Sequence, residues 1–291
     1  MRELRRILFP VDFSERCRGA ARHAAFLAGR FHAQLLLLHV VETPVTRPGE
    51  LDFGVLAFEA DLQARTKRAA DLIEAFSEPG FESLEIAREV ASGDAARTIV
   101  RCATERSADL IMMPTHGYGV FRRFVLGSVT AKVLHDAHCP VWTGVHLERA
   151  AAATEPVSYA RVLCAVDLSA ASDRPLRAAV GFASVLGAEL AAVHAVPGSE
   201  AVPDRFMDRE LRMDLVQDAR QRLAARLEQA GAPAATVIIE GGEPAKVIHA
   251  AALRHNAGVV FIGRGEHAGA GRLRTHSYAI IRESPCPVIS V

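Results

Sequence analysis

The sequence predicts an α/β protein built from two tandem doubly wound parallel sheets of five strands each, a Rossmann-like or flavodoxin-like arrangement. Two observations predict this fold class. Short apolar runs alternate with segments of helical periodicity, as in parallel β-α-β units with right-handed crossovers. The whole pattern then recurs once, with the same landmarks in each half of the chain.

The repeat is visible in short motifs at matching places. A Val-Asp-x-Ser motif contains Asp12 in the first half and Asp167 in the second, and an apolar-His-apolar motif contains His39 and His194 with the same separation. A period this long excludes a solenoid and indicates a duplicated domain. The expected divisions are a first copy at 1–146, a linker at 147–160 and a second, degenerate copy at 161–291.

The elements of the first copy follow from local patterns. Ile7–Val11 is a short apolar run that predicts a buried strand, and apolar residues between Cys17 and Phe31 recur at helical spacing. Leu35–Val41 predicts a second strand. The stretch from about Leu56 to Phe76 predicts a second helix, and the mixed charges at helical spacing over Glu59–Glu74 are interpreted as its solvated face.

The rest of the copy continues the alternation. Leu84–Ala91 predicts a third strand, and Asp94 beside a glycine predicts the N-cap of the next helix. Leu110–Met113 predicts the fourth strand, Ser128–His135 a short helix, and Val141–Val145 the fifth strand. The second copy repeats this order.

The overall composition excludes several classes of protein. The chain has 34 basic and 34 acidic side chains, so no net charge attracts nucleic acid or an anionic membrane. No run approaches the roughly 18 apolar residues of a membrane span, and the apolar run near the start is too short for a signal peptide. The five cysteines are scattered and form no Cys-x-x-Cys pair, so we expect a reducing cytoplasm and no disulfide framework.

The stretch 114–130 is the candidate ligand-binding segment, because it joins the fourth strand to the start of a helix. Glycine backbone approaches phosphate oxygens closely, and a helix N-terminus presents N–H groups with partial positive charge. The Ser128 and Thr130 hydroxyls and the Arg122 and Arg123 guanidinium groups add potential donors. The alternative is a polar loop in which Ser128 only caps the helix.

The spacing Pro114-x2-Gly117-x9-Gly127-Ser128 resembles the Gly-x2-Gly-x9-Gly-Ser/Thr motif of the universal stress protein family, in its tandem two-domain form. The resemblance covers almost the whole chain, once per half. It implies that the first copy binds ATP or a related adenine nucleotide, with or without Mg²⁺, and that Asp12 and Val40 hold adenine and ribose. The implied site residues are Pro10, Val11, Asp12, Val40, Pro114, His116, Gly117, Arg122, Arg123, Gly127, Ser128, Val129 and Thr130.

Departures from the family motif separate the two copies. Pro114 replaces the first glycine, lacks an N–H and has a fixed φ, so a phosphate donor or a tight turn is at risk. In the second copy, Glu266 would repel phosphate and Arg274 would crowd the backbone, and Ala195 replaces Val40. We therefore expect nucleotide in the first copy and not in the second.

Two motifs are interpreted as coincidences. Gly263-x-Gly265-x-x-Ala268 with Glu283 meets a loose dinucleotide fingerprint, but it follows the fourth strand instead of the first. His135 and His138 beside Cys139 have no further metal ligand nearby, so packing explains them better than a metal. No P-loop motif occurs.

Several single residues have competing interpretations. His39 and His194 are expected to be buried, hydrogen-bonded structural histidines. His116 is expected at the surface, with a phosphate contact as the alternative. Asp12 and Asp167 each suit helix capping or ligand binding; we favour a ribose or adenine contact for Asp12 and capping for Asp167.

These features predict a cytoplasmic stress-response protein in which bound nucleotide biases association with an unidentified protein partner. It is not expected to be an enzyme, because no nucleophile–base pair or carboxylate pair accompanies the phosphate loop, although slow ATP hydrolysis is left open. The alternatives are a nucleotide-free scaffold and, more weakly, an adenylylating enzyme. In the family, fifth strands often pair, so Val141–Val145 and Val288–Val291 are candidates for an intrachain pseudo-dimer, with a homodimer also open.

Overall fold

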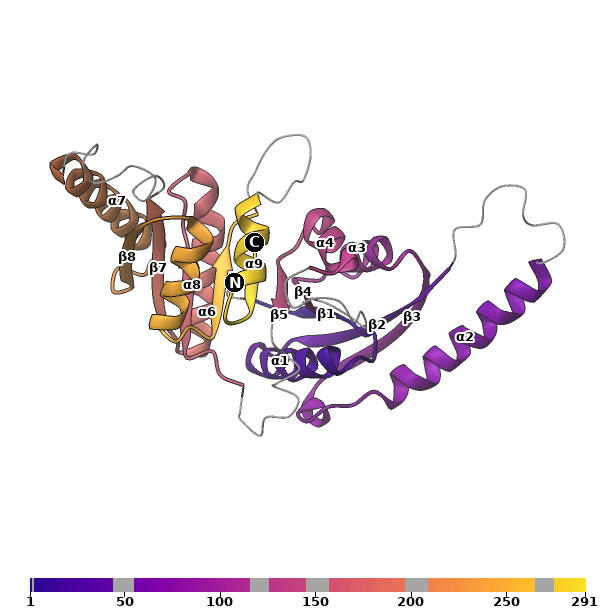
Figure 1. Cartoon of the computed structure of the whole chain (residues 1–291). Helices are drawn as coiled ribbons and strands as arrows, with labels where there is room; N and C mark the ends of the chain where they lie inside the picture. Colours follow the sequence, from indigo (N-terminus) through magenta and orange to yellow (C-terminus); the bar gives the residue numbers. More distant parts are fainter. Residues whose placement is uncertain (2, 44–54, 116–125, 145–156, 197–208, 265–274) are drawn as a thin grey trace.

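The computed structural model describes residues 1, 3–43, 55–115, 126–144, 157–196, 209–264 and 275–291 (Figure 1). The first copy contains β1 (Arg6–Pro10), α1 (Glu15–Phe31), β2 (Gln34–Glu42), α2 (Val55–Ala75), the 3-10 turn η1 (Phe81–Ser83), β3 (Ile86–Gly93), α3 (Ala95–Glu105), β4 (Leu110–Pro114), α4 (Ser128–Asp136) and β5 (Val141–Gly144). The second copy contains β6 (Arg161–Ala165), η2 (Ala170–Ser172), α6 (Asp173–Leu186), β7 (Glu189–Val196), α7 (Arg209–Gln229), β8 (Thr236–Gly241), α8 (Pro244–Arg254), β9 (Val259–Ile262), α9 (Thr275–Glu283) and β10 (Val288–Ser290).

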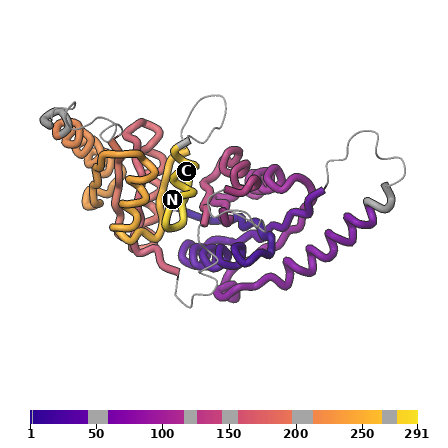
Figure 2. Tube along the Cα trace, viewed as in Figure 1, coloured from indigo at the N-terminus to yellow at the C-terminus, as the bar shows by residue number. Residues whose placement is uncertain are grey.

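The strands form one ten-stranded sheet in the order β3-β2-β1-β4-β5-β10-β9-β6-β7-β8. Strand pairs within each copy are parallel, which confirms the predicted doubly wound arrangement. The two halves meet where β10 pairs antiparallel with β5, with Ile289 opposite Trp142 and Val288 opposite Thr143. The expected contact between the fifth strands is thus present, and it joins the two five-stranded sheets into one (Figures 1 and 2).

The alternation of side chains along the strands supplies a core on each face of the sheet. Ile7 and Phe9 of β1 pack in a cluster with α1, whereas Leu8 between them packs with residues of α3 and α4. Burial on both faces explains why β1 is a continuous apolar run instead of an alternating one. Within the described residues, no helix is long and apolar enough to cross a membrane.

Local signals set the helix starts. Asp94 is the N-cap of α3, where its side chain accepts a hydrogen bond from the Arg97 N–H at 2.9 Å, as predicted. The structure places α4 at the predicted residue, Ser128, but the alternative that Ser128 caps this helix is wrong. The N-cap is Gly127, which has no side chain to cap with, and Ser128 is the first helical residue.

A buried aromatic cluster closes the junction between the copies. The Tyr159 hydroxyl accepts a hydrogen bond from the Trp142 indole N–H at 3.1 Å and lies 2.8 Å from His23 Nδ1. Tyr159 lies within the predicted linker at 147–160 yet is almost fully buried; residues 145–156 lie outside the described part of the chain. Burial, with a smaller effect from the Arg22 charge, lowers the pKa of His23 to about 4.

Candidate functional site

A cavity of about 220 Å³ lies at the carboxyl ends of the strands in the first copy. It is beside the point where the strand order reverses between β1 and β4, which is where open α/β sheets bind ligands. Seven of the predicted site residues line it: Pro10, Val11, Asp12, Val40, Pro114, Val129 and Thr130. The remaining wall is formed by Leu38, His39, Glu42, Ala95, Ile99 and Met113.

Asp12 lies on the cavity wall and also supports the cap of α1. Its Oδ1 accepts hydrogen bonds from the Ser14 N–H at 2.9 Å and the Ser14 hydroxyl at 2.7 Å. Ser14 is the N-cap, since its Oγ accepts from the Cys17 N–H at 3.1 Å. At this turn Ser14 therefore caps α1, and Asp12 both accepts hydrogen bonds from Ser14 and lines the cavity.

The residue between them has an unusual backbone. Phe13 has φ of 63°, and its counterpart in the second copy, Leu168, has φ of 60°. The left-handed region costs a non-glycine residue about 1–2 kcal/mol, and such strain concentrates at functional turns. The Phe13 ring packs on His39, with 4.8 Å between ring centroids, and on Phe76 at 6.0 Å. Sequence reasoning missed this conformation, because a bulky apolar residue gives no signal for it.

The two equivalent histidines are hydrogen-bonded as predicted, although both are only half-buried. His39 Nδ1 lies 2.7 Å from the Val11 carbonyl oxygen, and His194 Nδ1 lies 2.7 Å from that of Val166. A carbonyl oxygen only accepts, so each Nδ1 carries a proton and donates it. In the neutral ring, Nε2 is then an acceptor, and both rings line cavities.

Val129 and Thr130 at the start of α4 line the cavity, whereas the predicted site residues Gly127 and Ser128 are not among its lining residues. Gly127 has φ of −60° and ψ of 146°, and its N–H donates to the Thr115 carbonyl at 2.9 Å. Ser128, Val129 and Thr130 occupy the first helical turn, where N–H groups have no acceptor within the helix. The Thr130 hydroxyl is buried and donates to the Pro114 carbonyl at 3.1 Å, so its proton holds α4 against β4 in this arrangement.

The backbone at Pro114 is part of a strand and not of a tight turn. It is the last residue of β4 and pairs with Gly144 of β5, so its backbone is extended and compatible with the fixed φ of proline. The counterpart, Gly263, has no positive φ, and a Cβ there would meet only Pro175 at an ordinary 3.5 Å. The backbone therefore does not require glycine here, and the missing N–H is the remaining difference from the motif.

The central part of the phosphate motif is not among the described residues. His116, Gly117, Arg122 and Arg123 all lie outside them, as do Glu266 and Arg274 of the second copy. Their predicted roles remain predictions.

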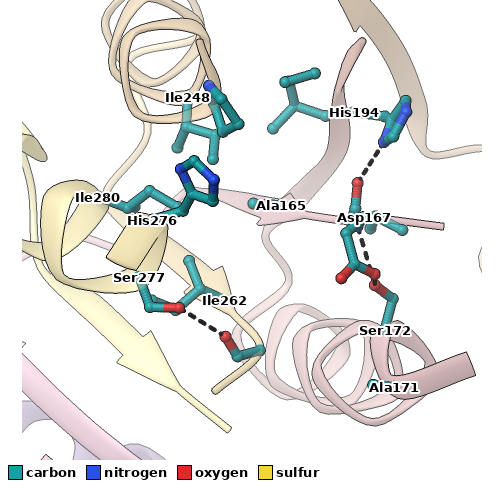
Figure 3. Close-up of a pocket in the computed structure, with 15 residues that line it drawn as sticks. Ala165, Asp167, Ala171, Ser172, His194, Ile248, Ile262, His276, Ser277 and Ile280 are labelled. Atoms are coloured by element: carbon teal, nitrogen blue, oxygen red, sulfur yellow. Dashed lines mark hydrogen bonds between the residues drawn. The ribbon is translucent and has the colours of Figure 1, made fainter. Parts of the chain in front are cut away.

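The second copy has its own cavity, of about 350 Å³, at the equivalent place (Figure 3). Asp167 Oδ1 accepts from the Ser169 N–H at 2.9 Å and from the hydroxyls of Ser169 and Ser172. Asp167 thus bonds within its own turn and is not the N-cap of the following helices, whose N-caps are Ser169 for η2 and Ser172 for α6. His276 lines the cavity where the first copy has Val129, and its Nδ1 lies 3.9 Å from Glu243 Oε1. The second copy thus keeps a cavity that reasoning from its loop alone did not anticipate.

In each of the two motifs interpreted as coincidences, one residue forms a polar contact with its neighbour in sequence. His135 Nδ1 lies 2.5 Å from Asp136 Oδ1, and Glu283 Oε1 accepts from Arg282 at 2.7 Å. Among the described residues, no group of three or more His, Cys, Asp or Glu side chains could hold a metal ion.

The fold and cavities define a doubly wound α/β domain, present twice, with a cavity at the carboxyl ends of its parallel strands. Residues 3–143 and 158–291 each match the model of the Universal stress protein family, and the chain therefore belongs to this family, with its domain in tandem.

Known relatives resemble one domain or the whole chain. A universal stress protein from Synechocystis sp. is 39% identical over 139 residues, 46% of this chain and 82% of the relative. One from Thermus aquaticus is 37% identical over 139 residues, 46% of this chain and 94% of the relative. The crystal structure of a universal stress protein from Archaeoglobus fulgidus has the same fold, with a TM-score of 0.66, 24% identity and coverage of 99% of this chain and 96% of that one.

Proposed function

We propose that the first copy binds ATP or a related adenine nucleotide and that the protein acts as a nucleotide-dependent regulator in the cytoplasm. The observation that carries this proposal is that one cavity is lined both by the Asp12 carboxylate and by the first turn of α4. No side chain caps the N-terminus of this helix. A ligand that is polar at one end and anionic at the other matches these two features.

The adenosine part is assigned to the ends of β1 and β2. In this proposal the Asp12 carboxylate accepts from ribose hydroxyls, and Val40, which lines the same cavity, offers its backbone to the edge of the base. Apolar side chains, including Ile99 and Met113, provide surface for the flat faces of adenine. A nucleoside with hydrogen-bonding ribose hydroxyls suits this wall better than a purely apolar ligand.

The phosphate part is assigned to the first turn of α4. Its N–H groups and the helix dipole favour an anion there, and Gly127 has no side chain to occupy the space. Ser128 is exposed and adds a hydroxyl beside the predicted contributions of Gly117, Arg122 and Arg123. Among the described residues that line the cavity, the acidic side chains are Asp12 and Glu42 near the ends of β1 and β2, so Mg²⁺, if bound, would be carried by the phosphates.

Regulation follows from the bonds that nucleotide would replace. Gly127 and Thr130 now donate to the carbonyls of Thr115 and Pro114, so phosphate at α4 competes with bonds that hold the ends of the loop. Ligand binding that replaces these two bonds would change how α4 is held against β4 and so the affinity for a protein partner. These same internal bonds favour the second candidate function, a scaffold that works without nucleotide.

The test is analysis of nucleotide released from freshly purified protein, followed by calorimetric titration with ATP. We expect about one ATP per chain, loss of binding in Gly127→Arg, and unchanged binding in the matched second-copy variant Asp167→Ala. No bound nucleotide and no binding heat would refute the proposal in favour of the scaffold. Two equivalents per chain would show that the second cavity also binds.

A further inference from the structure

One side chain of the second copy reaches directly into the first. Arg264 follows β9, and its guanidinium Nη1 donates to the Ala137 carbonyl at 2.6 Å while Nη2 donates to the Cys139 carbonyl. These two carbonyls belong to the turn between α4 and β5. The guanidinium fork suits two neighbouring carbonyl oxygens, a geometry that a lysine ammonium cannot copy.

Arg264 occupies the position in the second copy that Thr115 occupies in the first, but the two side chains make different contacts. The backbones match, since the Arg264 N–H donates to the Val291 carbonyl at 3.2 Å and the Thr115 N–H donates to that of Gly144 at 3.1 Å. The Thr115 hydroxyl also donates to Gly144, inside its own copy, at 3.2 Å. At this position the second copy therefore replaces a short local contact with a long side chain across the junction.

The turn held by Arg264 is the end of α4. Ala137 is the C-cap of this helix, and its N–H donates to the Val133 carbonyl. The first turn of the same helix, with Val129 and Thr130, lines the first-copy cavity. A continuous helix of nine residues, roughly 14 Å long, moves as one piece, so fixing its C-terminal end restricts its N-terminal end.

Two further contacts place α4 between the copies. Tyr278 of α9 lies with its hydroxyl 3.5 Å from the Ala131 carbonyl in the middle of α4. On the first-copy side, Lys132 Nζ lies 3.5 Å from Asp94 Oδ2 at the start of α3. The second copy contacts α4 and the turn after it through Tyr278 and Arg264. The hydrogen bonds of Arg264 are shorter than the Tyr278 contact, and their donor is a charged guanidinium group. Burial lowers the pKa of Arg264 to about 10, which leaves it protonated at neutral pH.

We propose that Arg264 is a positioning residue through which the second copy sets the phosphate end of the nucleotide site in the first copy. The inference rests on the proposed function, because it concerns the site on α4. Arg264 acts on α4 and not on the adenosine wall, which is formed by the ends of β1 and β2 with apolar side chains of α3 and β4. Loss of Arg264 therefore weakens binding of phosphate groups and leaves binding of the nucleoside unchanged.

The experiment compares ATP with adenosine on the full chain. ATP affinity is measured by calorimetry, and adenosine affinity by displacement of a fluorescent ATP analogue. For Arg264→Ala we expect ATP to bind roughly 2- to 30-fold more weakly, with adenosine affinity within about twofold of the parent. Arg264→Lys, which keeps the charge and stem without the fork, should lose part of the ATP affinity and replaces the alanine variant if that chain does not fold.

The matched control is Arg254→Ala, which removes an exposed arginine of the second copy that pairs with Glu240. It should change neither affinity. Hydrogen exchange gives a readout that needs no nucleotide: amides of α4 should exchange faster in Arg264→Ala and not in Arg254→Ala.

Equal losses for ATP and adenosine in the Arg264 variants would overturn the inference, because they indicate general destabilisation. Unchanged affinities, or unchanged exchange in α4, would also overturn it. If the parent chain binds ATP and the Arg264 variants bind it equally well, only this inference fails. If the parent chain binds no ATP, the proposed function fails and the inference fails with it.

Discussion

Lowering the pH should destabilise the protein through a single histidine at the junction between the copies. Trp142 can only donate its indole N–H, so it uses an acceptor site of the Tyr159 oxygen. A neutral His23 imidazole with its proton on Nε2 accepts the Tyr159 hydroxyl proton at Nδ1, 2.8 Å away. Protonated His23 would place a second donor against Tyr159 in a partly buried site.

The magnitude follows from the pKa of His23, which burial lowers to about 4 in the folded chain. Because the folded pKa lies below the unfolded value of about 6.5, the contribution of His23 to stability is complete above that pH and is lost as the pH falls toward 4. Through proton linkage, the unfolding free energy should decrease by about 2 kcal/mol between pH 7.5 and 5, and by about 3 kcal/mol by pH 4.

The assay is urea unfolding at pH 7.5, 6 and 5, followed by the fluorescence of Trp142, the single tryptophan. Other groups titrate in the same range, so the measured quantity is the difference in unfolding free energy between the parent and His23→Gln. That difference should fall by about 2 kcal/mol from pH 7.5 to 5. The exposed His138→Gln serves as the control for removing a histidine outside this junction. A difference for His23→Gln that stays constant from pH 7.5 to 5 would refute the reasoning.

Three further predictions concern the interior of the molecule. Tyr159→Phe leaves the buried Trp142 N–H without its acceptor and should lower the unfolding free energy by about 1–3 kcal/mol in urea titrations; an unchanged midpoint would contradict the hydrogen bond. Ile289→Ala removes a fully buried side chain beside the β5–β10 seam and should cost about 2–5 kcal/mol by the same method, whereas a cost below about 1 kcal/mol would mean that the seam is loosely packed. Burial raises the pKa of all five thiols, so a thiol reagent at pH 8 should react slowly with the native chain and rapidly with all five after unfolding; fast labelling of the native chain would show that a thiol is accessible and ionised.

The arrangement of elements was predictable because its signals are local. The helix beginning after Asp94 follows from a capping side chain and a glycine, and the helix predicted from Ser128 begins at that residue. The pairing of β5 with β10 was expected from the family resemblance and not from the residues themselves. The topology then brings Asp12, Val40 and Val129 to one cavity, although each is remote from the others in sequence.

The parts that were not predictable depend on contacts between distant residues. Tyr159 lies in a segment whose composition is typical of a linker, and only its contacts with Trp142 and His23 explain its burial. Arg264 looks like an ordinary loop residue until the seam brings Ala137 within its reach. The size of the second cavity likewise depends on how neighbouring side chains pack, which a motif does not encode.

The antiparallel seam between β5 and β10 also determines which way the two cavities open. Each cavity lies at the carboxyl ends of its own parallel strands, and the strands of one copy run opposite to those of the other. The two openings therefore face opposite rims of the shared sheet. A macromolecule docked on one rim would therefore not cover the opening at the other rim.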